Sequence, residues 1–360
     1  MVCIAAFIVL LAIWLFTPIL RLFGKKKLAN TISKLFKKSV HCFSRRVTLR
    51  ACDSNFKDEI KESILSKLII RHKKLVKPVS AGIEVSAILI VFITIWSSLT
   101  IVKSGLALYV YGTCNVKTPA SCALSTSQAC SIDNFEKSNP VKDWFTDWGE
   151  IFGALPSRVK TWNASEYIPT GASFYEVDKN TSAPKKDALD IFDPGCIVCR
   201  NSFNAQLKSG FFSKYKTYII PYVITGEDGD KFKNSRLVAN YIEAVRGRTP
   251  KDKSISAEWV IVENLFTGKD KEGRSYQELF NGTTSTTYSE KEATEKIESW
   301  LLKAGFTKEE ILEIREKTTS DEVKAKLKEN SKLVEDKIKT KRIPTMIYDG
   351  KRHEGLFEDK

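Results

Sequence analysis

Two long stretches of this 360-residue chain contain no charged side chain. Residues 2–20 form the first stretch and residues 85–102 the second, and both approach the roughly 20 apolar residues that a helix needs to cross a bilayer core of about 30 Å. No Lys or Arg precedes the first stretch, as a cleavable signal would require, so we interpret it as a retained anchor. The alternative for either stretch is the buried core helix of a globular domain. We expect transmembrane helices at residues 1–22 and 79–111.

The positive charge of the chain is concentrated between these two stretches. The formal net charge is +14, and residues 21–78 alone contain 17 Lys or Arg against 4 Asp or Glu. The rest of the chain is nearly neutral, with 40 basic and 39 acidic residues, so the basicity does not indicate binding to nucleic acid. Loops that collect Lys and Arg stay in the cytoplasm. We therefore predict a two-pass protein of the lipid bilayer, with a basic cytoplasmic loop at residues 23–78 and with the N-terminus and everything after Lys103 outside.

The eight cysteines divide according to this predicted topology. Cys42 and Cys52 lie in the basic loop, where thiols of a cytoplasmic segment stay reduced. The other six lie on the oxidising side, and Cys196 and Cys199 among them form a C-x-x-C pair. The remaining four are candidates for structural disulfides, but four cysteines allow three pairings, and free buried thiols are an alternative. These four are Cys3, Cys114, Cys122 and Cys130.

The C-x-x-C pair lies at the predicted start of a helix that follows a buried strand, which is a position that favours redox chemistry. Residues 188–192 predict a short buried strand, a turn follows at residues 193–195, and the residues after Cys196 have helical spacing. The N-terminus of a helix stabilises a thiolate on Cys196, and Cys199, one turn later, can attack a mixed disulfide. Half a zinc site is the alternative, disfavoured because no second C-x-x-C exists, and a purely structural disulfide is another. We expect no metal and no cofactor, because the cysteines themselves carry the two electrons.

Strand character returns twice after this motif, at residues 218–224 and at residues 342–348, where Asp349-Gly350 predicts a hairpin turn. Between these strands we expect a helical insertion at about residues 231–339. Capping boxes, in which Ser or Thr is followed three residues later by Glu, predict the starts of three of its helices. The three boxes begin at Ser289, Thr307 and Thr319.

Four segments together resemble the DsbA-like branch of the thioredoxin superfamily, in the order of that family and within about residues 170–356. They are Asp190-Ile-Phe-Asp-Pro-Gly-Cys-Ile-Val-Cys199, Ala257-Glu-Trp-Val with Glu263-Asn-Leu-Phe266, Ala304-Gly-Phe-Thr307, and Lys341-Arg-Ile-Pro-Thr-Met-Ile-Tyr-Asp-Gly350. The resemblance implies an α/β thioredoxin-like fold with a helical insertion at residues 170–360. It also implies a cis peptide at Ile343-Pro344 that faces the cysteines, with Ile343, Pro344 and Thr345 shaping a substrate groove.

The sequence departs from this family in two respects. Ile197-Val198 lacks the polar or cationic group of the Pro-His dipeptide found in strongly oxidising relatives, which implies a less acidic Cys196. The family usually continues into a final helix that covers the sheet, whereas this sequence stops at Lys360. Residues 112–169, a connector rich in cysteine and aromatic residues, are a candidate for that cover, and an incomplete sequence is the alternative.

We therefore expect a membrane-anchored thiol–disulfide oxidoreductase, with Cys196 as nucleophile and Cys199 as resolving thiol. Its partners would be cysteine-containing exported proteins and a membrane redox protein that resets the pair. Oxidase activity is favoured over reductase or isomerase activity, and the composition together with the resemblance favours a bacterial cell membrane. The alternative is a non-catalytic component of an envelope or secretion assembly, in which a thioredoxin-like fold binds partners and contains a structural disulfide.

Overall fold

The computed structural model describes residues 76–119, 129–133, 139–176, 186–250, 255–282 and 284–358, together with Ser33, Lys37, Val40 and His41. The predicted first transmembrane helix lies outside the described residues, as does nearly all of the basic loop. Cys3, Cys42, Cys52 and Cys122 also lie outside them. The chain divides into two compact units, Met1–Val102 and Lys103–Lys360.

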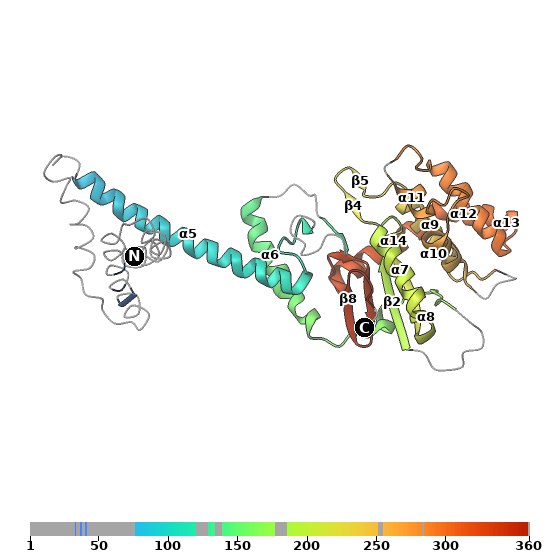
Figure 1. Cartoon of the computed structure of the whole chain (residues 1–360), viewed down its shortest axis with the longest axis horizontal. Helices are drawn as coiled ribbons and strands as arrows, with labels where there is room; N and C mark the ends of the chain where they lie inside the picture. Colours follow the sequence, from blue (N-terminus) through green and yellow to red (C-terminus); the bar gives the residue numbers. More distant parts are fainter. Residues whose placement is uncertain are drawn as a thin grey trace, which may run out of the picture. The chain divides into compact units, whose positions relative to one another are not determined.

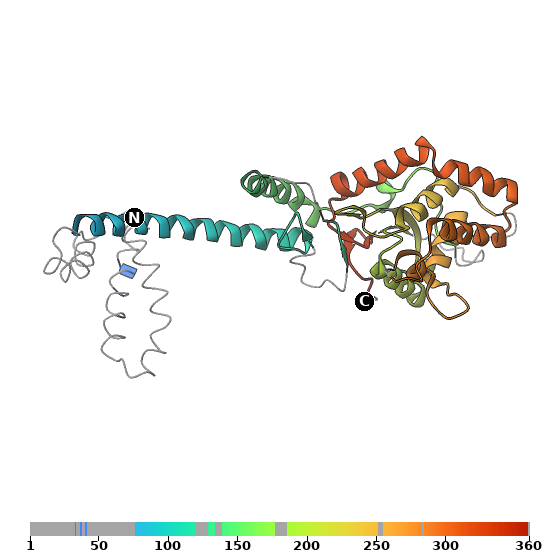
Figure 2. The same cartoon turned by 90° about the horizontal axis from the view of Figure 1, so that it is seen from above.

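A single helix, α5 (Val76–Tyr111), contains the second apolar stretch (Figure 2). From Lys77 to Tyr111 it is long and apolar enough to cross a membrane, by length and composition. Three of its hydroxyl groups are satisfied inside the helix: Thr94 donates to the Ile90 carbonyl four residues earlier at 2.7 Å, and Ser98 and Thr100 donate in the same way. The described residues thus contain one candidate membrane helix, and the structure does not test a second pass.

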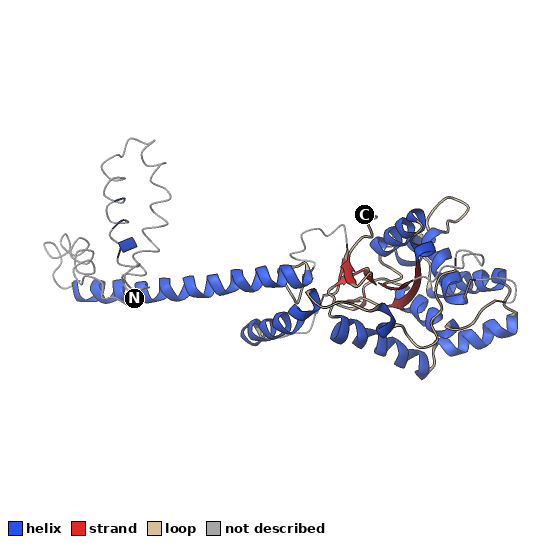
Figure 3. Cartoon of the chain, turned by 90° about the horizontal axis from the view of Figure 1, so that it is seen from below, coloured by secondary structure: helices blue, strands red, loops and turns tan. Residues whose placement is uncertain are grey.

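The second unit is built on a four-stranded mixed sheet in the order β3-β2-β7-β8. The central strand β2 (Lys186–Phe192) runs parallel to β3 (Tyr215–Pro221) and antiparallel to β7 (Thr345–Tyr348). The hairpin predicted at Asp349-Gly350 is confirmed, since β7 continues into β8 (Lys351–Glu354). Figure 3 shows helices surrounding these strands. Because both faces of β2 are covered, its last five residues are all buried, as expected for an apolar parallel strand.

Helices occupy most of the chain around this sheet (Figure 1). The capping boxes at Ser289 and Thr307 are confirmed, whereas the third helix begins one residue later than expected, with Ser320 accepting from the Val323 N–H. Between β3 and β6 (Arg342–Ile343) also lie the short strands β4 (Thr225–Gly226) and β5 (Gly229–Asp230). The helices are α6 (Pro140–Ala154), α7 (Ile197–Ser209), α8 (Phe211–Lys214), α9 (Ser235–Val245), α10 (Ala257–Thr267), α11 (Tyr276–Asn281), α12 (Glu290–Ala304), α13 (Lys308–Thr318), α14 (Asp321–Lys332), the π-helix η6 (Leu333–Ile338), and the 3-10 helices η4 (Leu155–Arg158) and η5 (Ala164–Tyr167).

An aromatic cluster forms the core beneath α7. Phe203 of α7 packs against Phe212, Trp259 and Phe266, with ring centroids 5.4 to 6.3 Å apart. The indole of Trp259 donates to the Ser173 carbonyl at 2.9 Å, so its polar atom is satisfied in the core. The connector also contributes to this core through Trp162 and Tyr167, which are buried with it. These contacts fix α7, and therefore the cysteines at its start, against the sheet.

A buried ion network joins α9 to α10. Arg246 donates to the Glu243 carboxylate at 2.8 and 2.6 Å and lies 4.0 Å from Glu258, and the three side chains are at most 1 % exposed. Burial raises the pKa of Glu258 to about 7, although Arg246 and backbone hydrogen bonds lower it. Among the residues that the structure describes, Arg246 is therefore the cation that compensates both buried carboxylates.

We predict that Arg246→Leu destabilises the protein by about 3–5 kcal/mol, because it leaves two buried acids without their cation. Arg248→Leu is the matched control. Arg248 lies 3.7 Å from Glu313 in a partly exposed pair, so its loss should cost less than about 1 kcal/mol. Urea unfolding of the full chain, followed by tryptophan fluorescence, measures both. Equal losses from the two variants would contradict the role assigned to the network.

Candidate active site

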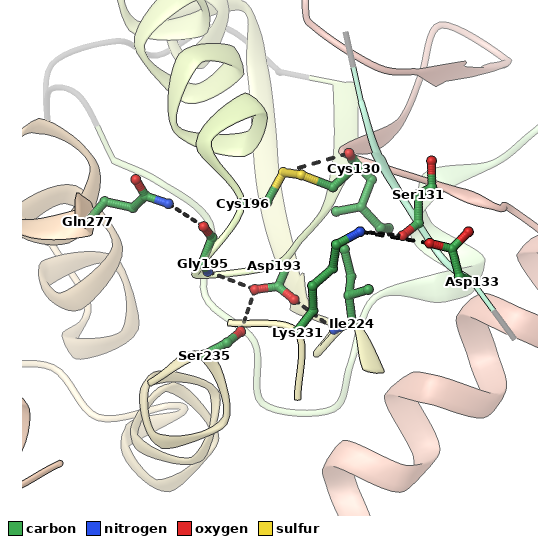
Figure 4. The surroundings of a disulfide bond; sticks show 11 residues. Cys130, Ser131, Asp133, Asp193, Gly195, Cys196, Ile224, Lys231, Ser235 and Gln277 are labelled. Carbon is green, nitrogen blue, oxygen red and sulfur yellow. Dashed lines mark hydrogen bonds and ion pairs between the residues drawn. A yellow bond between two sulfur atoms is a disulfide. The ribbon is translucent and has the colours of Figure 1, made fainter. Parts of the chain in front are cut away.

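A buried carboxylate organises the turn between β2 and α7. Asp193 accepts hydrogen bonds from the backbone N–H groups of Gly195 and Ile224, both at 2.7 Å, and from the Ser235 hydroxyl (Figure 4). Its backbone carbonyl accepts from the Cys196 N–H at 3.0 Å. Burial raises the pKa of Asp193 to about 6, while these hydrogen bonds to its carboxylate lower it. The turn is thus anchored to the end of β3 and to the start of α9.

Gly195 allows a close approach of the next segment to this turn. A Cβ at this position would lie 2.3 Å from Cβ of Phe232, which is closer than van der Waals contact permits. The amide of Gln277 donates to the Gly195 carbonyl from α11 (Figure 4). Both backbone groups of Gly195 are therefore hydrogen-bonded where the chain enters α7, the N–H to Asp193 and the carbonyl to Gln277.

Cys196 is the N-cap residue of α7, as the sequence predicts, but its sulfur is already bonded. It forms a disulfide with Cys130, 66 residues earlier in the chain (Figure 4). This pairing differs from the possibilities that the sequence left open, in which Cys130 would pair with Cys3, Cys114 or Cys122 or remain a free thiol. Cys114 is also disulfide-bonded, and its partner lies outside the described residues. With its sulfur bonded to Cys130, Cys196 is completely buried.

Cys199 carries the one free thiol among the described cysteines, and it is buried. Burial raises the pKa of this thiol well above its usual value, and the negative charges of Asp193 and Asp190 raise it further. A hydrogen bond with the Asp193 backbone acts in the opposite direction. At neutral pH the thiol is therefore protonated, and it becomes a nucleophile only when a base removes its proton.

Asp190 is an acid inside the central strand. It is buried, and one carboxylate oxygen accepts from the Gln206 amide at 3.0 Å, while the other has no hydrogen-bond partner in the described part of the chain. Burial raises its pKa to about 6, and the bond from Gln206 lowers it. Neither Asp190 nor Asp193 was predicted from the sequence to be a site residue. The available signal was a charged residue within the apolar run at residues 188–192. Burying a carboxylate costs free energy, and buried acids of this kind cluster at functional sites.

The Ile343-Pro344 peptide is cis, as the resemblance implies. The expected single strand at residues 342–348 is split at Pro344 into β6 and β7. The Ile343 carbonyl oxygen lies 3.9 Å from the Cys196 sulfur, so these two predicted site residues are adjacent. Thr345 instead donates its hydroxyl to the Arg342 carbonyl at 2.6 Å, which makes it a support of β6.

The described residues contain no group of three or more His, Cys, Asp or Glu side chains that could hold a metal ion. The sulfur atoms of the site can exchange disulfide partners with one another. Its elements are the Cys130–Cys196 disulfide, the buried Cys199 thiol and the two carboxylates that act on that thiol.

Comparison with known proteins gives a distant likeness among solved structures. No family model matches the chain, and no curated protein matches it. Among solved structures, MdbA, a thiol-disulfide oxidoreductase from Corynebacterium matruchotii, is similar with a TM-score of 0.34 and 18% sequence identity over 53% of this chain and 91% of that one. The strand order, with a C-x-x-C opening α7, gives a mixed α/β domain.

We predict that Gly195→Ala destabilises the domain by about 1–3 kcal/mol, because its Cβ must displace the Phe232 side chain, beginning with its Cβ. Gly226→Ala serves as the control, since a Cβ there would meet its nearest atom at an ordinary 3.4 Å. Thermal unfolding of the two variants measures the difference. A Gly195→Ala protein as stable as the control would show that the turn is not tightly packed.

Proposed function

We propose that this protein is a membrane-anchored thiol–disulfide oxidoreductase that acts on the cysteines of exported proteins. The disulfide between Cys196 and a cysteine of an extended segment carries the proposal. That segment, β1 (Cys130–Ser131), pairs antiparallel with β6, and the buried Cys199 thiol lies one helical turn from the disulfide. This arrangement has the components of a mixed disulfide between an enzyme and a substrate strand.

The proposed reaction begins with the Cys196–Cys199 disulfide. A substrate thiolate attacks the Cys196 sulfur, and Cys199 leaves and takes up a proton. A second substrate thiolate then attacks the sulfur joined to Cys196, which forms the substrate disulfide and releases Cys196. The substrate loses two electrons and the pair gains them, so a membrane redox partner must accept these electrons before the next turnover.

Asp190 is the group that we propose exchanges the proton with Cys199. Its negative charge acts on the Cys199 thiol, and one of its oxygens has no hydrogen-bond partner among the described residues. With a pKa of about 6, its carboxylate is mostly ionised at neutral pH and can accept the proton when Cys199 attacks.

Oxidation of substrates is the direction that we favour, with reductase or isomerase activity as alternatives. The two residues between the cysteines are Ile197, which is 48% exposed, and the buried Val198. Neither side chain offers a charge or a hydrogen-bond donor to a thiolate on Cys196. The backbone N–H groups and the dipole at the N-terminus of α7 are the feature that stabilises such a thiolate. Equilibration of the Cys196–Cys199 pair with glutathione buffers measures its reduction potential and thereby separates these alternatives.

We propose that α5 anchors the domain in a bacterial cell membrane, with the C-terminal domain outside the cytoplasm. The basic loop that precedes α5 supports this orientation. A periplasmic-type reporter, active only after export, fused to Lys360 should therefore be active, and a cytoplasmic reporter at the same position should be inactive. The reverse pattern would contradict both the orientation and the oxidising environment assumed for the cysteines.

Trapping of substrates tests the assignment of the two cysteines, and it is best done with Cys130→Ser so that the internal disulfide cannot form. Adding Cys199→Ser should accumulate mixed disulfides with exported proteins, because the resolving thiol is absent. Adding Cys196→Ser instead should trap none. Acid-quenched cells analysed on non-reducing gels show the adducts. Equal trapping by both double variants would show that the roles are wrongly assigned.

The alternative function is a non-catalytic component of an envelope assembly. The complete burial of Cys196 favours it, because a structural disulfide is protected from exchange in this way. Mild reduction of the folded full chain separates the two functions. Rapid reduction followed by alkylation of Cys196 supports the oxidoreductase, whereas a disulfide that yields only after unfolding supports the structural role.

A further inference from the structure

The segment that carries Cys130 binds the domain as an additional strand. Cys130 is paired with Ile343 and Ser131 with Arg342 in an antiparallel register. The N–H of Ile132 donates to the Lys341 carbonyl at 3.0 Å. Pairing of an extended peptide with an exposed strand is a general mode of peptide recognition, in which the backbone supplies the hydrogen bonds.

Side chains hold the same segment independently of the disulfide. Lys231 donates to the Ser131 carbonyl at 3.4 Å and lies 4.0 Å from the Asp133 carboxylate (Figure 4). Ile132 belongs to the main hydrophobic core, where it is 9 % exposed. These contacts do not involve sulfur, so the segment retains binding interactions with the domain when the Cys130–Cys196 bond is broken.

Three cysteines are therefore associated with the start of α7: Cys130 and Cys196 share a disulfide, and the free thiol of Cys199 belongs to the first turn of that helix. We propose that Cys130 is a third redox-active cysteine: it occupies the place of a substrate cysteine, and its disulfide with Cys196 exchanges with the Cys196–Cys199 disulfide. This inference rests on the proposed function, because it assigns Cys130 a place in the same exchange chemistry. β1 is then an intramolecular substrate strand.

The exchange requires no external oxidant or reductant. The Cys199 thiol loses its proton, and the thiolate attacks the Cys196 sulfur. The Cys196–Cys199 bond forms while the Cys130–Cys196 bond breaks, and Cys130 leaves with the electron pair and takes up a proton. One disulfide and one thiol are present before and after the step, so electrons and protons balance.

This exchange regulates access to the site. Molecules with Cys130 bonded to Cys196 have their groove occupied, and only molecules with Cys130 released present the Cys196–Cys199 disulfide to another protein. When internal exchange is fast, the rate with a substrate equals the rate of the unoccupied site multiplied by the fraction of molecules in the released state. Cys130→Ser removes the competitor, and its rate relative to the wild type should equal the reciprocal of that fraction.

The test compares two independent measurements on the oxidised full chain in detergent. Acid quenching, alkylation and peptide mapping give the fraction of wild-type molecules in which Cys130 is a free thiol. Initial rates of oxidation of a reduced peptide with two cysteines give the ratio between Cys130→Ser and the wild type. We expect both disulfides in the wild type, the Cys130–Cys196 disulfide alone in Cys199→Ser, and a rate ratio equal to the reciprocal of the released fraction.

A second variant alters the strand and leaves all the sulfur atoms in place. Ile132→Pro removes the N–H that donates to Lys341, and it should therefore raise both the fraction with free Cys130 and the rate with the peptide. Lys231→Met removes the contacts to Ser131 and Asp133 from the opposite side of the pairing, and it should act in the same direction.

The possible failures are distinguishable. A wild type that holds only the Cys130–Cys196 disulfide at all times, or none of it, overturns the exchange. Equal rates from the wild type and Cys130→Ser, with that disulfide abundant in the wild type, overturn the occupation of the groove. If the wild type and Cys130→Ser both fail to oxidise the peptide while mapping shows both disulfides, the exchange stands and the proposed enzymatic function is overturned.

Discussion

The hydrogen bonds to the buried Asp193 carboxylate hold together the segments on which the candidate site depends. The turn before Cys196, the chain leaving β3 and the first residue of α9 all donate to this one group. Burial raises its pKa to about 6 and the hydrogen bonds lower it, so the same contacts that order the turn keep the group charged at neutral pH. That charge acts on Cys199 and disfavours its thiolate. The architecture of the turn and the reactivity of the thiol therefore have a common origin.

Local sequence signals predicted the parts of this structure that local interactions determine. The buried strand, the cysteine at the start of α7, the capping boxes at Ser289 and Thr307 and the turn at Asp349-Gly350 all depend on residues close in the chain. The partner of Cys130 was not predictable in this way, since it depends on a pairing of β1 with β6, strands more than 200 residues apart. A two-residue strand leaves no alternation to recognise, and spacing alone does not determine disulfide connectivity.

Two acidic groups act on the Cys199 thiol and disfavour its thiolate, whereas a strongly activated cysteine has its thiolate stabilised by positive charge. Asp190 and Asp193 both raise the pKa of Cys199, and no cation is among the causes that act on it. States in which Cys199 is a neutral thiol or part of a disulfide are therefore favoured over the thiolate. Cys196, by contrast, lies at a helix N-terminus, where negative charge is stabilised. A thiolate is thus favoured at Cys196 and disfavoured at Cys199, which supports different roles for the two cysteines.

The attachment of β1 to the same chain has a consequence for how the protein would respond to its surroundings. An internal cysteine competes at a fixed effective concentration, which depends on the geometry of the tether and is unaffected by the amount of protein in the membrane. Under the proposed function, an exported protein would compete at its own concentration, which varies with secretion. The ratio of these two quantities would determine how much of the groove holds substrate, so more copies of this protein would leave the inhibited fraction unchanged, whereas a higher supply of substrate would shift the groove toward it.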